Sequence, residues 1–125
     1  IQGKATQFVM ILDALQLRLL EKIRSDLAGY SVVRSTSPLD NRAIWLEIFA
    51  GGIHKGNSCQ TLLKKLNINC KEVAGLGNDY NDIDFLDICA EAYLVANAPV
   101  NLQRHYKLVK SDKEEGFTEF ISKVL

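Results

Sequence analysis

The stretch Gly77-Asn78-Asp79-Tyr80-Asn81-Asp82 decides how this chain is interpreted. It follows the apolar run Val73-Ala74-Gly75-Leu76 and precedes the periodic segment Ile83-Asp84-Phe85-Leu86, an order that predicts a strand, a polar loop and a helix. Open α/β sheets bind ligands where their strands end, and the free amides at a helix start attract anions. The stretch therefore predicts a magnesium and phosphate site.

The same stretch also has a purely structural explanation, because Asn and Asp are favoured in turns and as helix N-caps. Taken alone, the two explanations carry about equal weight. Five polar or hydroxyl-bearing residues in a row, however, exceed what one cap requires. Carboxylate and carboxamide oxygens are also the hard ligands that Mg²⁺ prefers, so the balance moves toward a metal site.

Two residues outside the loop are candidates for the same site. Lys55 begins a predicted helix, where its ammonium could meet a phosphoryl oxygen and Gly56 would allow close backbone approach. A solvated lysine is the commoner case for an isolated position. Asn97 ends a predicted strand next to the loop, so its amide either caps the helix that begins near Pro99 or faces the same ligand.

The surrounding elements predict two parts. Up to Gly51, apolar spacing predicts a long helix from about Thr6 to Ala28, followed by an antiparallel hairpin of residues 30–35 and 43–49 that the helix backs. After Gly52, helices and strands alternate, which predicts right-handed crossovers and a parallel sheet. The expected strands of that sheet are 72–76, 92–96 and 107–109. Three of the expected helices contain Cys59 to Leu66, span residues 82–89 and begin near Pro99, respectively. A last helix is expected to be capped by Ser111 and Glu114. Its apolar face would consist of Phe117, Phe120, Ile121 and Val124.

Composition narrows the function classes. Lys plus Arg and Asp plus Glu number 15 each among 125 residues, and neither sign forms a long block, so bulk charge predicts no binding to nucleic acid or to a membrane. We also expect no signal peptide and no spanning helix. Cys59, Cys70 and Cys89 form no C-x-x-C pair and lie beside apolar stretches. They predict buried thiols in a reducing cytoplasm, with a redox or metal role as the alternative.

The chain resembles the haloacid dehalogenase superfamily, and within it the Cof-type phosphatases with a large inserted cap, in the order of four motifs: His54-Lys55-Gly56, residues 72–82, Val95-Ala96-Asn97-Ala98 and Glu114-Glu115-Gly116-Phe117. The resemblance is close over residues 43–125 and holds in pattern only over 6–42. It implies Mg²⁺-dependent hydrolysis of phosphate monoesters, usually sugar phosphates or related small metabolites, through an aspartyl-phosphate.

The resemblance also implies roles for individual residues. Lys55 would neutralise charge on the nucleophile and the phosphoryl group, while Asn81 and Asn97 would contact the phosphate. Asn78 and Asp82 would occupy the two acidic positions of the G-D-x-x-N-D pattern, which hold magnesium directly or through water. Asp79 would replace Asn78 if the loop register shifts by one.

Two departures from the family pattern matter. Position 78 is Asn where the pattern has Asp, which removes one negative charge and leaves a weaker magnesium ligand. The D-x-D nucleophile motif is absent, and the early residues Asp13 and Asp26 lie in a helical pattern with no strand before them. The chain also begins at Ile1 rather than at methionine, which suggests a processed product or an excised fragment. We therefore expect the C-terminal half of such an enzyme.

The prediction is an α/β protein in two domains. Residues 1–52 would be the remainder of an α+β cap, and residues 53–125 the second half of a Rossmann-like parallel-sheet core. The parent protein would be a cytoplasmic phosphatase acting on a small phosphorylated metabolite, whereas this chain alone would be inactive. Its partner would be the missing N-terminal half or a second copy. The alternative function is a non-catalytic phosphate-binding or assembly module.

Overall fold

The computed structural model describes residues 4–37, 39 and 43–125. The chain divides into two compact units, with the division between His54 and Lys55. Each unit has its own sheet and its own buried apolar cluster. Among the residues described, no helix has the length and apolar character that crossing a bilayer requires.

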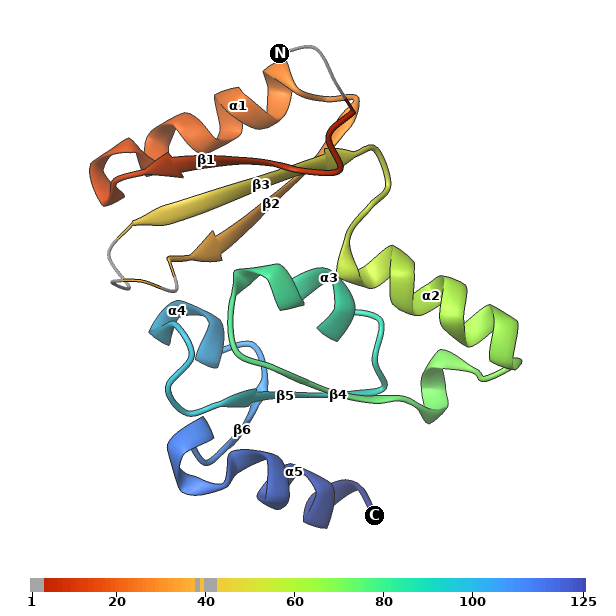
Figure 1. Ribbon diagram of the computed structural model, residues 1–125. Coiled ribbons are helices and arrows are strands. Elements are labelled where there is room, and N and C mark those ends of the chain that lie inside the picture. The colour runs from red at the N-terminus through yellow and green to blue at the C-terminus, as the bar shows by residue number, and fades with distance from the viewer. Residues whose placement is uncertain (1–3, 38, 40–42) are drawn as a thin grey trace. The chain divides into compact units, whose positions relative to one another are not determined.

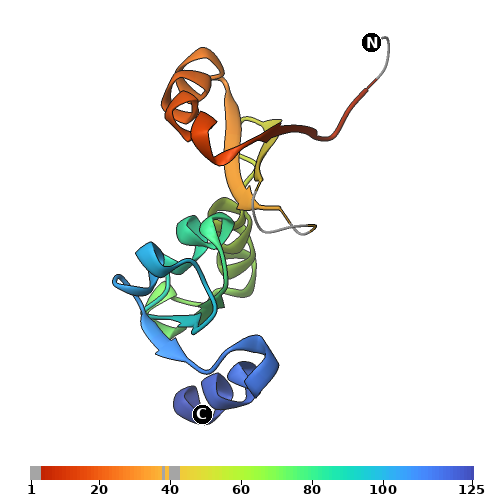
Figure 2. The same ribbon diagram turned by 90° about the vertical axis from the view of Figure 1, so that its left-hand side faces the viewer.

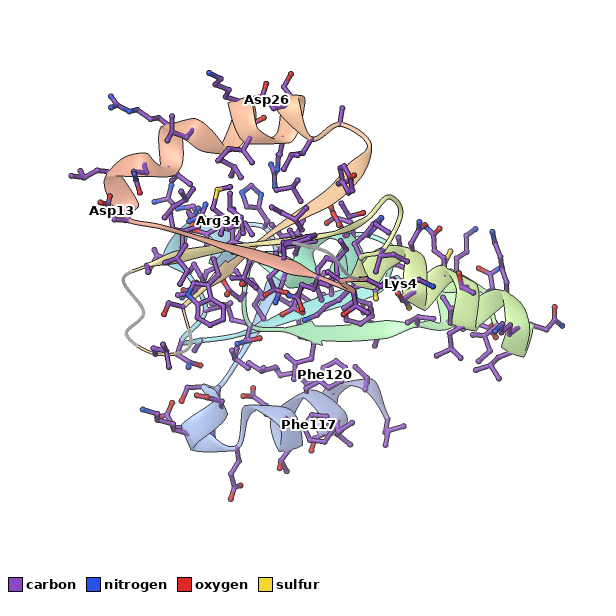
Figure 3. All side chains as sticks on the ribbon, turned by 45° about the horizontal axis from the view of Figure 1, so that its top comes forward. Lys4, Asp13, Asp26, Arg34, Phe117 and Phe120 are labelled. Atoms are coloured by element: carbon purple, nitrogen blue, oxygen red, sulfur yellow. The ribbon has the colours of Figure 1, made fainter. Side chains whose placement is uncertain are left out.

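The first unit is a three-stranded antiparallel sheet with a helical segment over one face (Figure 1). Its strands lie in the order β1-β3-β2 and span Phe8–Leu12 (β1), Tyr30–Thr36 (β2) and Ile44–Ala50 (β3). The helical segment consists of the 3-10 helix η1 (Ala14–Leu19) and the helix α1 (Leu20–Asp26), and Figure 3 labels Asp13 and Asp26 at its two ends. β2 and β3 form the predicted antiparallel hairpin, with Thr36 opposite Ile44.

The single long helix predicted from Thr6 to Ala28 is wrong, because β1 occupies its start. Phe8–Leu12 pair antiparallel with β3. Five consecutive apolar residues, some of them β-branched, are compatible with a strand as well as with a buried helix. The apolar spacing alone therefore did not distinguish the two. Asp13 separates the two elements: its Oδ1 accepts the N–H of Leu15 at 2.8 Å, and its own N–H donates to Gln16 Oε1 at 3.0 Å. That capping box begins a new helix after the strand.

The second unit is a three-stranded parallel sheet with helices on both faces, as the sequence predicts (Figures 1 and 2). The strands lie in the order β4-β5-β6 and span Ala74–Gly77 (β4), Glu91–Val95 (β5) and Lys107–Val109 (β6). The helix α3 (Ile83–Leu86), which packs against α2 (Lys55–Leu66), lies on one side of the sheet, and α5 (Gly116–Val124) lies on the other. The remaining elements are α4 (Val100–Gln103) and the 3-10 helices η2 (Cys70–Glu72), η3 (Tyr80–Asp82) and η4 (Asp112–Glu114).

The core of this unit lies between the sheet and its helices. Tyr93, Leu94 and Val95 are all buried, as expected for a central parallel strand that is covered on both faces. Tyr93 packs edge-on against Phe120 of α5, with 5.4 Å between the ring centroids. Phe120 is 7% exposed and lies between α5 and the sheet (Figure 3). The prediction that Phe117 belongs to the same buried stripe is wrong, because its side chain is 65% exposed.

The predicted cap of the last helix is also wrong. The Ser111 hydroxyl donates to Glu114 Oε2 at 2.6 Å and does not accept a helix amide. The helix α5 begins only at Gly116, after Glu115 adopts a left-handed backbone with φ 64°. Glycine is required at position 116, because a Cβ there would lie 2.0 Å from the Lys110 carbonyl oxygen.

The three cysteines are free thiols. Cys59 and Cys89 are partly buried and Cys70 is exposed, so the prediction that all three are buried is wrong for Cys70. Cys70 is the first residue of the short 3-10 helix η2, in which none of the residues is buried.

Candidate functional site

The predicted polar loop lies at the carboxyl edge of the parallel sheet. β4 ends at Gly77, and Asn78 and Asp79 lead into η3, which continues directly into α3 (Figure 1). The neighbouring strand β5 runs in the same direction, with Leu94 opposite Gly77, so its following residues reach the same edge. This is where parallel α/β sheets bind their ligands.

Asp82 organises this loop. The residue is buried, and its Oδ2 accepts the N–H of Asn78 at 2.7 Å and that of Asp79 at 3.2 Å. Gly77 permits the fold, since a Cβ at that position would lie 2.7 Å from the Cβ of Asp82. Protein N–H donors therefore replace the water molecules that the carboxylate loses on burial. A buried charge needs such hydrogen bonds to be stable.

Lys55, the first residue of α2, supplies the charge that balances Asp82. Its Nζ donates to Asp82 Oδ1 at 2.5 Å and to Asn81 Oδ1 at 3.3 Å. The Lys55 side chain is 52% exposed and that of Asp82 is 7% exposed, so the ammonium remains accessible while its partner is buried. Gly56 lets α2 approach α3 closely, because a Cβ there would lie 2.4 Å from the Asp84 carbonyl oxygen. Lys55, Asn81 and Asp82 therefore come together in one cluster.

The other acidic-loop residues offer oxygens for a metal ion. Asp79 is 8% exposed, and its Oδ1 accepts the N–H of Tyr80 at 2.8 Å as the N-cap of η3. The side chain of Asn78 is exposed, and both oxygens of Asp82 already accept hydrogen bonds. Within the described part of the chain, no group of three or more His, Cys, Asp or Glu side chains is arranged to hold a metal. Mg²⁺ does not require such a group, because in proteins it is usually bound through one or two carboxylates and keeps water or phosphate as its other ligands.

Asn97 makes its hydrogen bonds elsewhere. Its Nδ2 donates to Asp112 Oδ1 at 2.8 Å, and its Oδ1 accepts the backbone N–H of Asp112 at 3.3 Å. Asp112 begins η4, just after β6, so this pair joins the loops that follow β5 and β6. The structure places Asn97 at the predicted edge of the sheet but in a separate pair from the Lys55 cluster.

The sequence did not predict two residues that hydrogen-bond to candidate site residues or to the acidic loop: Asp112 and Asn101. Asp112 follows a predicted strand, which was a usable signal, but the pattern of Ser111 and Glu114 suggested a helix cap instead. The Tyr80 hydroxyl donates to Asn101 Oδ1 at 2.7 Å and so ties the loop to α4. Tyr80 stood in the quoted loop, but no local signal links it to a residue on another helix.

Together, a parallel sheet with helical crossovers and a lysine–carboxylate cluster at its carboxyl edge define a Rossmann-type α/β core. Residues 2–121 match the family model described as haloacid dehalogenase-like hydrolase. The chain belongs to this family, as its motifs indicate.

Two curated relatives are similar to part of the chain. One, from Streptococcus pyogenes serotype M6, is named "Putative phosphatase" and is 27% identical over 95 residues, which cover 75% of this chain and 33% of that protein. The other has the same description, comes from Buchnera aphidicola and is 26% identical over 82 residues, which cover 63% of this chain and 30% of that protein. The chain thus spans about a third of the length of the curated relatives it matches.

Solved structures share the fold. A Streptococcus mutans protein superposes with a TM-score of 0.77 at 24% identity, covering 94% of this chain and 44% of that chain. A haloacid dehalogenase-like hydrolase from Bacillus subtilis gives a TM-score of 0.74 at 19% identity, and the match covers 94% of this chain and 41% of that chain. The sugar phosphatase BT4131, of subclass IIB of the superfamily, gives a TM-score of 0.77 at 14% identity, and the match covers 97% of this chain and 44% of that chain.

Proposed function

We propose that this chain is the C-terminal part of a magnesium-dependent, Cof-type phosphatase that hydrolyses small phosphate monoesters such as sugar phosphates. The observation that carries the proposal is the cluster of Lys55, Asn81 and Asp82 at the carboxyl edge of β4. The family and the phosphatase names of its relatives support it. In this proposal residues 1–52 are the remainder of the cap and 53–125 the second half of the core. A cytoplasmic location is part of it, since free thiols persist there.

The geometry suits recognition of a phosphoryl group. Phosphoryl transfer depends on positioning and on cancelling negative charge. The Lys55 ammonium has three N–H groups, of which two donate to Asp82 and Asn81, so a third can donate to a phosphoryl oxygen. Asn81 accepts through its Oδ1 and therefore keeps its amide hydrogens for the same ligand. Asp82 holds the ammonium in place at the carboxyl edge of the sheet.

Magnesium would be held by side-chain oxygens of Asn78, Asp79 or Asp82, and when bound it would cancel charge on the phosphoryl oxygens. Both oxygens of Asp82 already accept hydrogen bonds, so we propose that its contribution runs through a metal-bound water. The proposed nucleophile lies outside this chain. Asp13 does follow a strand, contrary to the sequence-based expectation, but β1 belongs to an antiparallel sheet and the Asp13 carboxylate caps η1.

The test is a phosphatase assay with p-nitrophenyl phosphate on this chain and on a form extended at its N-terminus through a strand ending in D-x-D. We expect the extended form to be active with Mg²⁺ and inactive with a chelator, and this chain alone to give no turnover. Lys55→Gln should lower kcat/KM of the extended form by about 10²- to 10³-fold, the usual effect of losing one electrostatic contact. The matched control is Lys64→Gln, an exposed lysine at the other end of α2, which should leave the rate unchanged. Turnover by the short chain that survives Lys55→Gln would overturn the proposal.

A further inference from the structure

We propose that Asp112 is a positioning residue, which fixes the orientation of the Asn97 amide so that one of its N–H groups is available to a phosphoryl oxygen. The inference rests on the proposed function and deepens it. Asp112 was not among the site residues that the sequence predicts. It contacts Asn97 through two hydrogen bonds.

The two hydrogen bonds between these residues can form in one orientation of the amide only. A carboxylate oxygen accepts and cannot donate, so Asp112 Oδ1 must meet the Nδ2 of Asn97, at 2.8 Å. A backbone N–H donates and cannot accept, so the Asp112 amide must meet the Oδ1 of Asn97, at 3.3 Å. Turning the Asn97 amide by half a rotation would place donor against donor and acceptor against acceptor. Asp112 therefore selects one of the two orientations.

The backbone on both sides of Asn97 is held as well. Gln103 of α4 donates through Nε2 to the carbonyl oxygens of Ala96 at 2.9 Å and Ala98 at 2.8 Å. β5 and β6 are paired up to Val95 and Val109, so the loops that carry Asn97 and Asp112 begin side by side. With both its backbone and its amide fixed, Asn97 keeps one Nδ2 hydrogen that Asp112 does not use. A donor held in place before the ligand arrives binds it with less loss of conformational freedom.

Charge and hydrogen bonding at position 112 can be separated. Asp112→Asn keeps an oxygen acceptor for Nδ2 and the backbone N–H for Oδ1, but removes a negative charge from the neighbourhood of an anion. Asp112→Ala removes the acceptor together with the charge. Asp112 and Asn97 are both exposed, so neither substitution empties the core. If orientation is the role of Asp112, the two variants will differ in phosphate affinity.

The experiment titrates this chain with inorganic phosphate in the presence of Mg²⁺, by isothermal calorimetry and by nuclear magnetic resonance of the Asn97 side-chain amide. We expect Asp112→Ala to bind phosphate about three- to tenfold more weakly, as for one lost orienting hydrogen bond. Asp112→Asn should bind as tightly as wild type or more tightly. The hydrogen bond to Asp112 should shift one Nδ2 proton resonance of Asn97 away from its value in a solvated amide in wild type and in Asp112→Asn, and this shift should be lost in Asp112→Ala.

The outcomes separate this inference from the proposed function. Phosphate binding by wild type with equal affinity in Asp112→Ala would overturn the inference and leave the function standing. Equal weakening in both variants would also overturn it, because charge rather than orientation would then decide. Unchanged Asn97 resonances in Asp112→Ala would overturn the orienting role whatever the affinities are. Absence of phosphate binding in wild type, with the Asn97 resonances behaving as expected, would count against the proposed function and not against the orienting pair.

Discussion

Asp82 serves two groups of partners with one buried carboxylate. Its Oδ2 gathers the amides of the loop after β4, and its Oδ1 holds the ammonium that begins α2. Loss of such an acceptor leaves the buried amide of Asp79 unpaired, at a cost of about 1–3 kcal/mol. The structural and the functional explanations of the acidic loop are therefore compatible, because the same side chain that shapes the turn also places Lys55.

Gly56 offers a test of how Lys55 is placed. In Gly56→Ala the new Cβ would lie 2.4 Å from the Asp84 carbonyl oxygen, so α2 must move away from α3. We expect a loss of about 1–3 kcal/mol in the free energy of unfolding, typical of overpacking, measured by urea denaturation. The matched control is Gly29→Ala, because a Cβ at position 29 meets nothing within 4 Å. A Gly56→Ala variant as stable as wild type would show that the two helices do not need this approach.

The thiols differ in their chemical environment. Burial raises the pKa of Cys89 to about 11, with smaller contributions from Cys59 and Cys70, and its Sγ donates to the Phe85 carbonyl oxygen at 3.3 Å. The thiolate is the form that alkylates, so near pH 8 Cys89 should react with iodoacetamide at least ~10-fold more slowly than exposed Cys70. Mass spectrometry of the labelled peptides measures both rates, and denaturant should make them similar. Equal rates in the folded protein would contradict the structure.

At the site, the sequence identifies the residues more readily than their partners. Lys55, Asn81 and Asp82 were predicted together, because a helix start and a polar loop after a strand are visible in the order of residues. The pairing of Asn97 with Asp112 was not predicted, since the partner comes from the loop after a different strand. Ser111 and Glu114 match the pattern of a helix cap. That local pattern favoured a cap and gave no sign of the contact between the two loops.

Among the elements, the parallel strands were the easiest to predict. Tyr93, Leu94 and Val95 form a buried apolar run bounded by turns, and β5 lies within one residue of its predicted start and end. β4 begins later than predicted, because Asn69 and Glu72 form a capping box that makes residues 70–72 a 3-10 helix. β1 was missed because its apolar residues also continue the helical spacing of the segment that follows. Only the pairing with β3, which is distant in sequence, decides between strand and helix there.

The tie between β5 and β6 predicts a dependence of stability on pH. Lys107 Nζ donates to Glu91 Oε2 at 2.9 Å, and this hydrogen bond, with one from the Tyr93 hydroxyl, lowers the pKa of Glu91 below its ordinary value of 4.5. A lowered pKa in the folded state means that the stabilisation is present above 4.5 and is lost as the pH falls through the lower value. We expect the urea midpoint of wild type to fall more steeply below about pH 5 than that of Glu91→Gln. Parallel curves for the two proteins would contradict this assignment.

For the whole molecule, the candidate site lies entirely within one unit. Lys55, the acidic loop, Asn97 and Asp112 all belong to residues 55–125. Binding of phosphate can therefore be tested on this chain without reference to how its two units are arranged. Turnover, in contrast, needs a nucleophile from outside the chain in the proposed mechanism. Binding without turnover is the behaviour that the structure and the proposal together predict.

The most direct test is a phosphate titration of the ¹⁵N-labelled chain, with and without Mg²⁺, followed through the backbone amide resonances. We predict saturable shifts at Lys55, Gly56 and residues 78–82, and their loss in Lys55→Gln but not in Lys64→Gln. Shifts that are absent from these residues, or that persist unchanged in Lys55→Gln, would contradict the claim that Lys55 and the acidic loop form a phosphate site.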